Sequence, residues 1–138
     1  LGRIEGVIRN FDLAVEKKNQ ELVLTAIQNG LIESAHDCSE GGLAIALAES
    51  AFKYQLGLSV QFGLPSAQLF AETQSRFVLT VAPENQTRFE EMMGDAAVLA
   101  GKVTDEAIIE ISATDGQIKI ETAVARKYWE DAIVCLMK

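Results

Sequence analysis

The residues best suited to chemistry in this chain lie together in one short segment, His36-Asp37-Cys38-Ser39-Glu40-Gly41-Gly42. This segment holds the only histidine of the chain, next to an acidic side chain and close to a serine. A short apolar stretch precedes it and an amphipathic run, 43–52, follows it, which predicts a strand, a polar turn and a helix. Glycines let backbone N–H groups approach a ligand, and a helix N-terminus favours phosphate or carboxylate. The candidate ligand-binding residues here are therefore His36, Asp37, Ser39, Gly41 and Gly42.

The same segment also has a purely structural interpretation. His36 and Asp37 could form local hydrogen bonds and cap the next helix, while Gly41 and Gly42 serve only the turn. A double glycine is a weak signal on its own. Because the chain has no second histidine to activate Cys38, we interpret this cysteine as a small filler residue.

A second concentration of polar residues, 72–76, stands just before a predicted apolar strand. Arg76 can bind a phosphate or carboxylate bidentately, and Glu72 and Gln74 can exchange hydrogen bonds with ribose hydroxyls or amides. Alternatively, Glu72 and Arg76 pair with each other in a solvated loop and contribute little. Both polar clusters flank predicted strands of the sheet, where ligand crevices of α/β folds form. We therefore expect the two clusters to share one crevice.

The elements that position these clusters alternate between helix and strand. Capping and periodicity predict helices at 12–29, 41–54 and 83–93 and near the C-terminus, and strands at 31–35, 57–62, 76–82, 98–103, 108–112 and 117–121. Thr114-Asp115-Gly116 predicts a hairpin with a type I′ turn. Tyr128 and Trp129 are predicted to lie in the core. Because a hairpin excludes a purely parallel sheet, we predict an α/β (α+β) domain with a mixed sheet flanked by helices.

Length and charge exclude several classes of protein. The 138 residues fit a single domain, and no apolar run approaches the length of about 18 residues that a membrane span needs. The net charge of −8 disfavours non-specific binding to nucleic acid. Cys38 and Cys135 form no disulfide framework, which favours a cytoplasmic protein, and the chain has no zinc spacing, Walker loop or Ser-His-Asp set. Since the chain begins without methionine, we expect it to be a fragment of a longer multidomain protein.

The two polar clusters resemble the signatures of a known family. The run from Ser34 to Ala44, followed by Ala46-Leu47-Ala48-Glu49-Ser50, closely resembles the last synthetase-type domain of the phosphoribosylformylglycinamidine synthases, the ATP-dependent amidotransferases of purine biosynthesis. The run from Leu69 to Phe77 is similar to the second signature of that family, with Ala71 and Thr73 at positions where small residues and serine are more usual. The resemblance extends from about Asp12 to Tyr128-Trp129-Glu130.

The resemblance implies a three-layer α/β/α domain of the aminoimidazole ribonucleotide synthetase C-terminal type, from the second of two pseudo-repeated halves. It further implies a ligase that converts formylglycinamide ribonucleotide, ATP and glutamine to the amidine through an iminophosphate. In the family, ATP, magnesium and the catalytic histidines belong mostly to N-terminal synthetase domains, and a glutaminase module supplies ammonia. The substrate-contacting Glu-x-Gln belongs to the copy in the first half. We therefore expect this fragment to hold no catalytic residue, to require no cofactor and to be inactive alone.

Two further expectations follow. A non-catalytic nucleotide-binding or scaffold domain is the alternative function. A domain separated from its neighbours exposes apolar surface, so self-association is expected, with the helix at 41–54 and the strand at 58–62 as the suspected surfaces.

Overall fold

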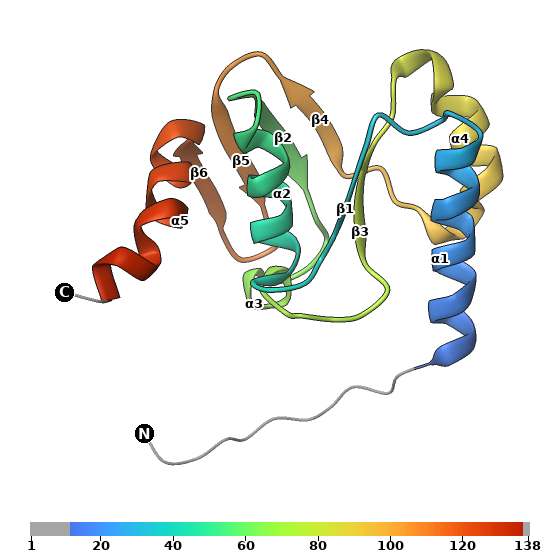
Figure 1. The fold of residues 1–138 in the computed structure, drawn as a ribbon, viewed down its shortest axis with the longest axis horizontal. Helices are drawn as coiled ribbons and strands as arrows, with labels where there is room; N and C mark the ends of the chain where they lie inside the picture. Colours follow the sequence, from blue (N-terminus) through green and yellow to red (C-terminus); the bar gives the residue numbers. More distant parts are fainter. Residues whose placement is uncertain (1–11, 137–138) are drawn as a thin grey trace.

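The computed structural model describes residues 12–136, with side chains for residues 12–132. Helices and strands alternate along this part of the chain (Figure 1). The helices are α1 (Leu13–Gln28), α2 (Gly42–Phe52), α3 (Ser66–Leu69), α4 (Gln86–Met93) and α5 (Thr122–Leu136), with 3₁₀ turns η1 (Pro83–Asn85) and η2 (Gly94–Ala96). The strands are β1 (Ser34–Asp37), β2 (Gly57–Gln61), β3 (Phe77–Thr80), β4 (Gly101–Thr104), β5 (Ile108–Ser112) and β6 (Gln117–Glu121).

The strands divide between two sheets. The antiparallel pair β1–β3 forms a two-stranded ribbon, and the other sheet has the order β4-β2-β5-β6. In this four-stranded sheet β2 pairs parallel with β5, whereas the other two pairings are antiparallel. The predicted mixed sheet and α+β class are therefore confirmed, although the sequence predicted one sheet rather than two.

Two apolar clusters build the core. The first joins α2 to the four-stranded sheet, and it contains Ala44, Leu47, Ala51, Phe52, Leu58, Val60, Leu69, Ile109 and Ile111. The second joins α1 and α4 to the ribbon, and it contains Val23, Ala26, Leu31, Phe89 and Met93. Val78 packs on the first cluster while Phe77 and Leu79 pack on the second. Helices thus lie on both faces of the ribbon, and the ribbon carries the first signature.

The start of β1 lies three residues later than predicted. Gly30 adopts a left-handed φ of +65°, and the N–H groups of Gly30 and Leu31 donate to the carbonyl oxygens of Ile27 and Ala26. This hydrogen-bond pattern closes the C-terminus of α1 and uses Leu31, which the sequence assigned to the strand. As a result, His36 and Asp37 are the last two residues of β1 rather than residues of the following turn.

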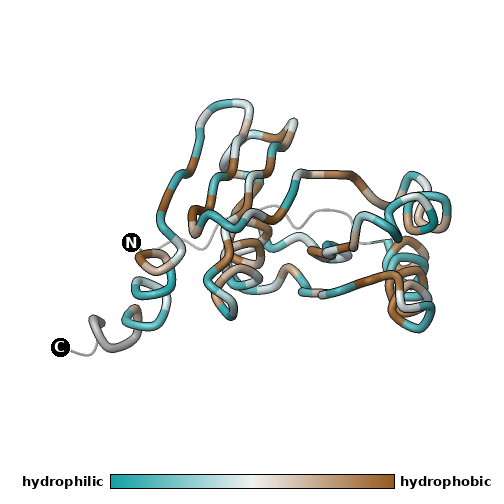
Figure 2. Tube along the Cα trace, turned by 90° about the horizontal axis from the view of Figure 1, so that it is seen from above, coloured by the Kyte–Doolittle hydropathy of each residue, from teal (hydrophilic) through white to brown (hydrophobic). Residues whose placement is uncertain are grey.

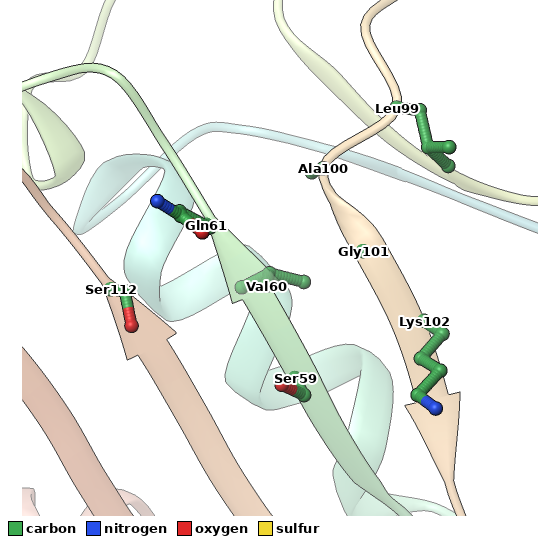
Figure 3. A pocket seen from close by; sticks show the side chains of 8 residues that line it. All are labelled: Ser59, Val60, Gln61, Leu99, Ala100, Gly101, Lys102 and Ser112. Atoms are coloured by element: carbon green, nitrogen blue, oxygen red, sulfur yellow. The ribbon is translucent and has the colours of Figure 1, made fainter.

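One face of the four-stranded sheet has no helix over it in the described part of the chain. Viewed from above, α2 lies on one side of the strands (Figure 2), and the opposite side carries the polar residues of β2, Ser59 and Gln61. A shallow hollow of about 460 Å³ opens between β2 and β4 on that side, with Lys102 and Ser112 at its border (Figure 3). None of the predicted site residues lines this hollow.

The C-terminal helix differs from the prediction. Tyr128 and Trp129 were predicted to be core residues, yet their exposed fractions are 74% and 52%. The helix instead meets the sheet through Ala125 and the fully buried Thr122, whose hydroxyl donates to the Leu56 carbonyl oxygen at 2.8 Å. The rings of Trp129 and Phe52 are tilted by 56° to each other, with their centroids 6.0 Å apart. Helical spacing alone therefore misplaced the buried face of α5.

The exposed apolar side chains also lie on other elements than predicted. Most of α2 and the residues Leu58 and Val60 of β2 are buried. The large exposed apolar side chains lie mainly on α1, around β4 and on α5: Leu13, Val15, Leu24, Ile27, Val98, Leu99, Val103, Val124, Tyr128 and Trp129. Segments 41–54 and 58–62, the suspected associating surfaces, are mostly buried because they build the first core, although Tyr54 at the end of the first is exposed. Self-association itself stays a prediction. Within the described residues, no helix combines the length and apolarity needed to cross a membrane.

The hairpin β5–β6 is confirmed, but its turn is not of type I′. A type I′ turn needs positive φ at both central residues, and neither Thr114 nor Asp115 has it. Asp115 instead accepts hydrogen bonds from the backbone N–H of Ser66 at 2.6 Å and from its hydroxyl at 3.1 Å. The turn is therefore shaped by its contact with the start of α3.

Replacing Asp115 by alanine is expected to lower the unfolding midpoint in urea at neutral pH and to have no effect in strong acid. The hydrogen bond from the Ser66 N–H is the main cause that holds the pKa of Asp115 below its ordinary value. A carboxylate with a depressed folded-state pKa stabilises the protein above the unfolded pKa, and this contribution is lost as the pH falls through the folded one. The wild type and Asp115→Ala should therefore converge well below about pH 3.9, the ordinary aspartate value. The exposed Asp105 provides the control, since Asp105→Ala removes the same charge without this contact. A constant difference at all pH values would contradict the assignment.

Candidate functional site

The two polar clusters of the sequence lie side by side. The N–H of Gly41 donates to Oε1 of Glu72 at 3.1 Å, and the N–H of Cys38 donates to the carbonyl oxygen of Arg76 at 3.0 Å. The first contact joins the start of α2 to the segment that follows α3, and the second extends the β1–β3 ribbon by one pair. Residues more than thirty positions apart are thus brought to one end of the ribbon.

The double glycine is required by the backbone at this junction. Gly41 and Gly42 both have left-handed φ angles, +78° and +64°. A Cβ atom on Gly42 would lie 2.7 Å from the carbonyl oxygen of Ala71, and one on Gly41 would lie 2.4 Å from the side chain of Ile45. The glycines therefore allow the chain to turn and the second signature to approach, which supports their structural interpretation.

A carboxylate of the chain itself lies beside the start of α2. We had expected this helix N-terminus to suit phosphate or carboxylate, and the carboxylate beside it belongs to Glu72. Arg76 is not the partner of Glu72: of the ion pairs among the described residues, none joins these two side chains. The alternative of a Glu72–Arg76 pair is therefore wrong.

Arg76 is half-buried on the side of the ribbon that faces α3. One of its guanidinium nitrogens, Nη1, donates to the carbonyl oxygen of Gln68 at 3.2 Å. Arg76 and Val78 are two residues apart, so their side chains share the face of the ribbon that also carries His36. Between the signature residues, Ser75 has a φ of +61° and its hydroxyl donates to Oε2 of Glu16 on α1, while Gln74 is exposed.

His36 and Asp37 do not cluster with each other. Successive side chains of a strand point to opposite faces, so Asp37 lies across from Phe77 on the α1 side while His36 lies across from Val78 on the α2 side. His36, Asp37 and Ser39 therefore lie at the carboxyl end of a strand as predicted, but the side chains of His36 and Asp37 are on opposite faces and do not form one cluster. The sequence placed the strand boundary too early, and that error assigned His36 and Asp37 to one turn.

The neighbour of His36 that the sequence analysis missed is Glu49. Oε2 of Glu49 lies 3.4 Å from Nε2 of His36, and Nδ1 of the same ring lies 2.7 Å from the carbonyl oxygen of Asp37. Glu49 is the only charged residue of α2. A single charge on an otherwise apolar and alanine-rich helix is a signal that could have identified it.

Cys38 is buried, as a filler residue would be. Burial is the main cause that raises the pKa of its thiol; the nearby Arg76 cation lowers this pKa and Asp37 raises it further. The raised pKa keeps the thiol protonated and unreactive at neutral pH. Within residues 12–132, no group of three or more His, Cys, Asp or Glu side chains is placed to hold a metal ion.

A family model described as "AIR synthase related protein, C-terminal domain" matches residues 8–113. The chain belongs to this family. The AIR synthase related C-terminal domain therefore accounts for α1 to β5, including both signatures and their junction.

The chain is also similar to several proteins named PurL. The phosphoribosylformylglycinamidine synthase subunit PurL of Limosilactobacillus reuteri strain DSM 20016 is 42% identical over 138 residues, which is 99% of this chain but 19% of that protein. Thermotoga maritima PurL complexed with FGAR superimposes with a TM-score of 0.72 at 22% identity, covering 83% of this chain and 21% of that one. The T. maritima PurL complexed with ATP gives the same TM-score and identity and covers 87% and 23%. These structures establish the fold, and the chain spans about a fifth of the length of these relatives.

Proposed function

We propose that this chain is the C-terminal domain of the second synthetase half of a cytoplasmic phosphoribosylformylglycinamidine synthase, the ligase of purine biosynthesis. The observation that carries the proposal is the 42% identity to a PurL subunit along 99% of the chain. The contacts between the two signatures also support it, because Gly41 binds Glu72, Gly42 lies close to Ala71, and Cys38 binds the backbone of Arg76. The substrates in this proposal are formylglycinamide ribonucleotide, ATP and ammonia from a glutaminase partner.

In this proposal the domain contributes one wall of a crevice. Arg76 keeps most of its five N–H donors, since only Nη1 is used within the described residues, and a guanidinium suits a phosphate or carboxylate. Ser39 and Gln74 are exposed at the same end of the ribbon. The family resemblance assigns ATP and magnesium to the N-terminal synthetase domains. Among the described residues, no group of three or more His, Cys, Asp or Glu side chains is placed to hold a metal ion.

A domain exchange tests the proposal. The segment of the L. reuteri PurL subunit that aligns with this chain is replaced by the 138 residues, and formation of the amidine is measured with ammonia supplied directly. We expect the exchanged protein to retain activity and a version lacking the domain to have none. A folded exchanged protein, verified by circular dichroism, that makes no amidine would overturn the proposed function.

The alternative of a non-catalytic scaffold domain is favoured by one observation, the use of Glu72 as an internal cap of α2. Arg76→Gln in the exchanged protein discriminates between the two. If Arg76 binds an anionic group, KM for formylglycinamide ribonucleotide should rise roughly tenfold, as for the loss of a charged hydrogen bond. Arg88→Gln on the exposed surface of α4 is the matched control. Unchanged kinetics in Arg76→Gln would support the scaffold role.

A further inference from the structure

His36 and Glu49 form a link between two elements that carry the site. His36 is the next-to-last residue of β1, and Glu49 lies seven residues after Gly42, about two turns into α2. The His36 side chain is 33% exposed and the Glu49 side chain 25% exposed. A half-buried carboxylate on an apolar helix loses part of its hydration, which costs free energy. A polar partner such as His36 offsets this cost.

The partners of the ring determine where its protons lie. A carbonyl oxygen can only accept a hydrogen bond, so the 2.7 Å contact with Asp37 places a proton on Nδ1 of His36. An ionised carboxylate is likewise only an acceptor, and it lies 3.4 Å from Nε2. When the ring carries both protons, both nitrogens are directed at acceptors within the domain.

We propose that Glu49 is a positioning residue that fixes the His36 ring as a link between β1 and α2. This inference deepens the proposed function and rests on it for its role in the crevice. In this link both ring nitrogens of His36 face acceptors within the domain, the Asp37 carbonyl oxygen and the Glu49 carboxylate. His36 therefore holds the turn at residues 37–41 in place rather than transferring protons. The side chains that remain to meet a ligand at this end of the ribbon include those of Ser39, Gln74 and Arg76.

The single histidine makes the test unambiguous. In the isotope-labelled 138-residue chain, a long-range proton–nitrogen correlation spectrum identifies the protonated ring nitrogen, and relaxation gives the order parameter of the ring C–H bonds. We expect a proton on Nδ1 and, at a pH at which Nε2 is also protonated, a ring order parameter of about 0.85, the value of a rigid backbone, against less than about 0.6 in Glu49→Ala. Both are read under conditions where the variants are fully folded, so a general loss of stability does not change them.

Three further variants complete the experiment. Glu40→Ala removes the same charge from an exposed position in the same motif and should leave the ring rigid. Glu49→Gln keeps a hydrogen-bonding group and should restore most of the rigidity. Glu49→Leu, which removes the carboxylate but keeps an apolar side chain on α2, should lose the rigidity and replaces Glu49→Ala if that variant does not fold. A wild-type ring that is mobile or protonated only on Nε2, or a ring that stays rigid in Glu49→Ala, would overturn the inference. Because the spectrum requires no substrate, this result is independent of whether the exchanged enzyme is active.

Discussion

Replacing Gly42 by alanine is expected to lower the free energy of unfolding by about 3 kcal/mol or more. Left-handed φ costs an alanine about 1–2 kcal/mol, and forced overpacking costs about 1–3 kcal/mol. Both penalties apply here, because Gly42 has a φ of +64° and a new Cβ would lie 2.7 Å from the Ala71 carbonyl oxygen and 3.0 Å from that of Leu69. Backbone atoms cannot move aside as a flexible side chain could, so the second signature would be pushed away from α2.

Substitutions at two other glycines distinguish the cost of the left-handed φ from the cost of overpacking. Gly30 has a φ of +65° with open space around its Cβ position, so Gly30→Ala should cost only the conformational part, about 1–2 kcal/mol. Gly63 has neither a positive φ nor a near neighbour, and Gly63→Ala should be nearly neutral. Urea unfolding followed by circular dichroism gives all three values. If Gly42→Ala cost no more than Gly30→Ala, the two signatures would not be packed against each other as described.

Truncating Leu69 to alanine is expected to destabilise the domain by about 2–5 kcal/mol, the range for a large core side chain. Leu69 is only 1% exposed and belongs to the first core cluster, together with Leu47 and Ile109. It is also the last residue of α3 and the first residue of the second signature. Its loss should therefore leave a cavity and also loosen the segment that carries Glu72 and Arg76.

The neighbouring Phe70 is the matched control for this experiment. Its side chain is 48% exposed, so Phe70→Ala removes a larger group at a lower cost, within about 1 kcal/mol. Amide hydrogen exchange of residues 72–76 provides the second measurement, with faster exchange expected in Leu69→Ala only. Equal destabilisation by the two variants would show that α3 is not anchored by its buried leucine.

The parts of the fold that could be predicted are those encoded by local signals. Asp12 accepts hydrogen bonds from the N–H groups of Ala14 and Val15 and starts α1 where the sequence indicated. Pro83 opens η1, which leads into α4, and the alternating residues of 108–121 form the predicted hairpin. In each case the signal and the structure it specifies lie within a few residues of each other.

The features that could not be predicted depend on contacts between distant residues. The turn at Asp115 is shaped by Ser66, forty-nine positions away, and local turn statistics contain no information on that bond. α5 packs against α2 and β6, with Thr122 and Ala125 among its less exposed residues, and this leaves Trp129 half exposed. The helical spacing of large residues pointed to a different face.

The candidate site shows the same division. The sequence indicated that the two signatures would meet, and Gly41 and Glu72 do so. It did not indicate that Glu72 would use its carboxylate inside the domain or that His36 would face Glu49. The contact of His36 depends on the register of β1, because a shift of one residue along the strand exchanges the faces of its side chains.

The parallel pairing of β2 with β5 has a consequence for how the chain folds. Leu58 lies opposite Ile109, so about fifty residues, including the whole ribbon partner β3 and helix α4, separate two strands at the centre of the sheet. Closing so long a loop lowers the chain entropy before the contacts between the strands can stabilise it. Domains with such distant pairings therefore fold more slowly than helical ones. The hairpin β5–β6 can form early because its strands are adjacent, whereas β2 can join it only after the intervening chain has become compact. During synthesis, α2 and β2 would therefore emerge well before β5, the strand that joins β2 at the centre of the sheet.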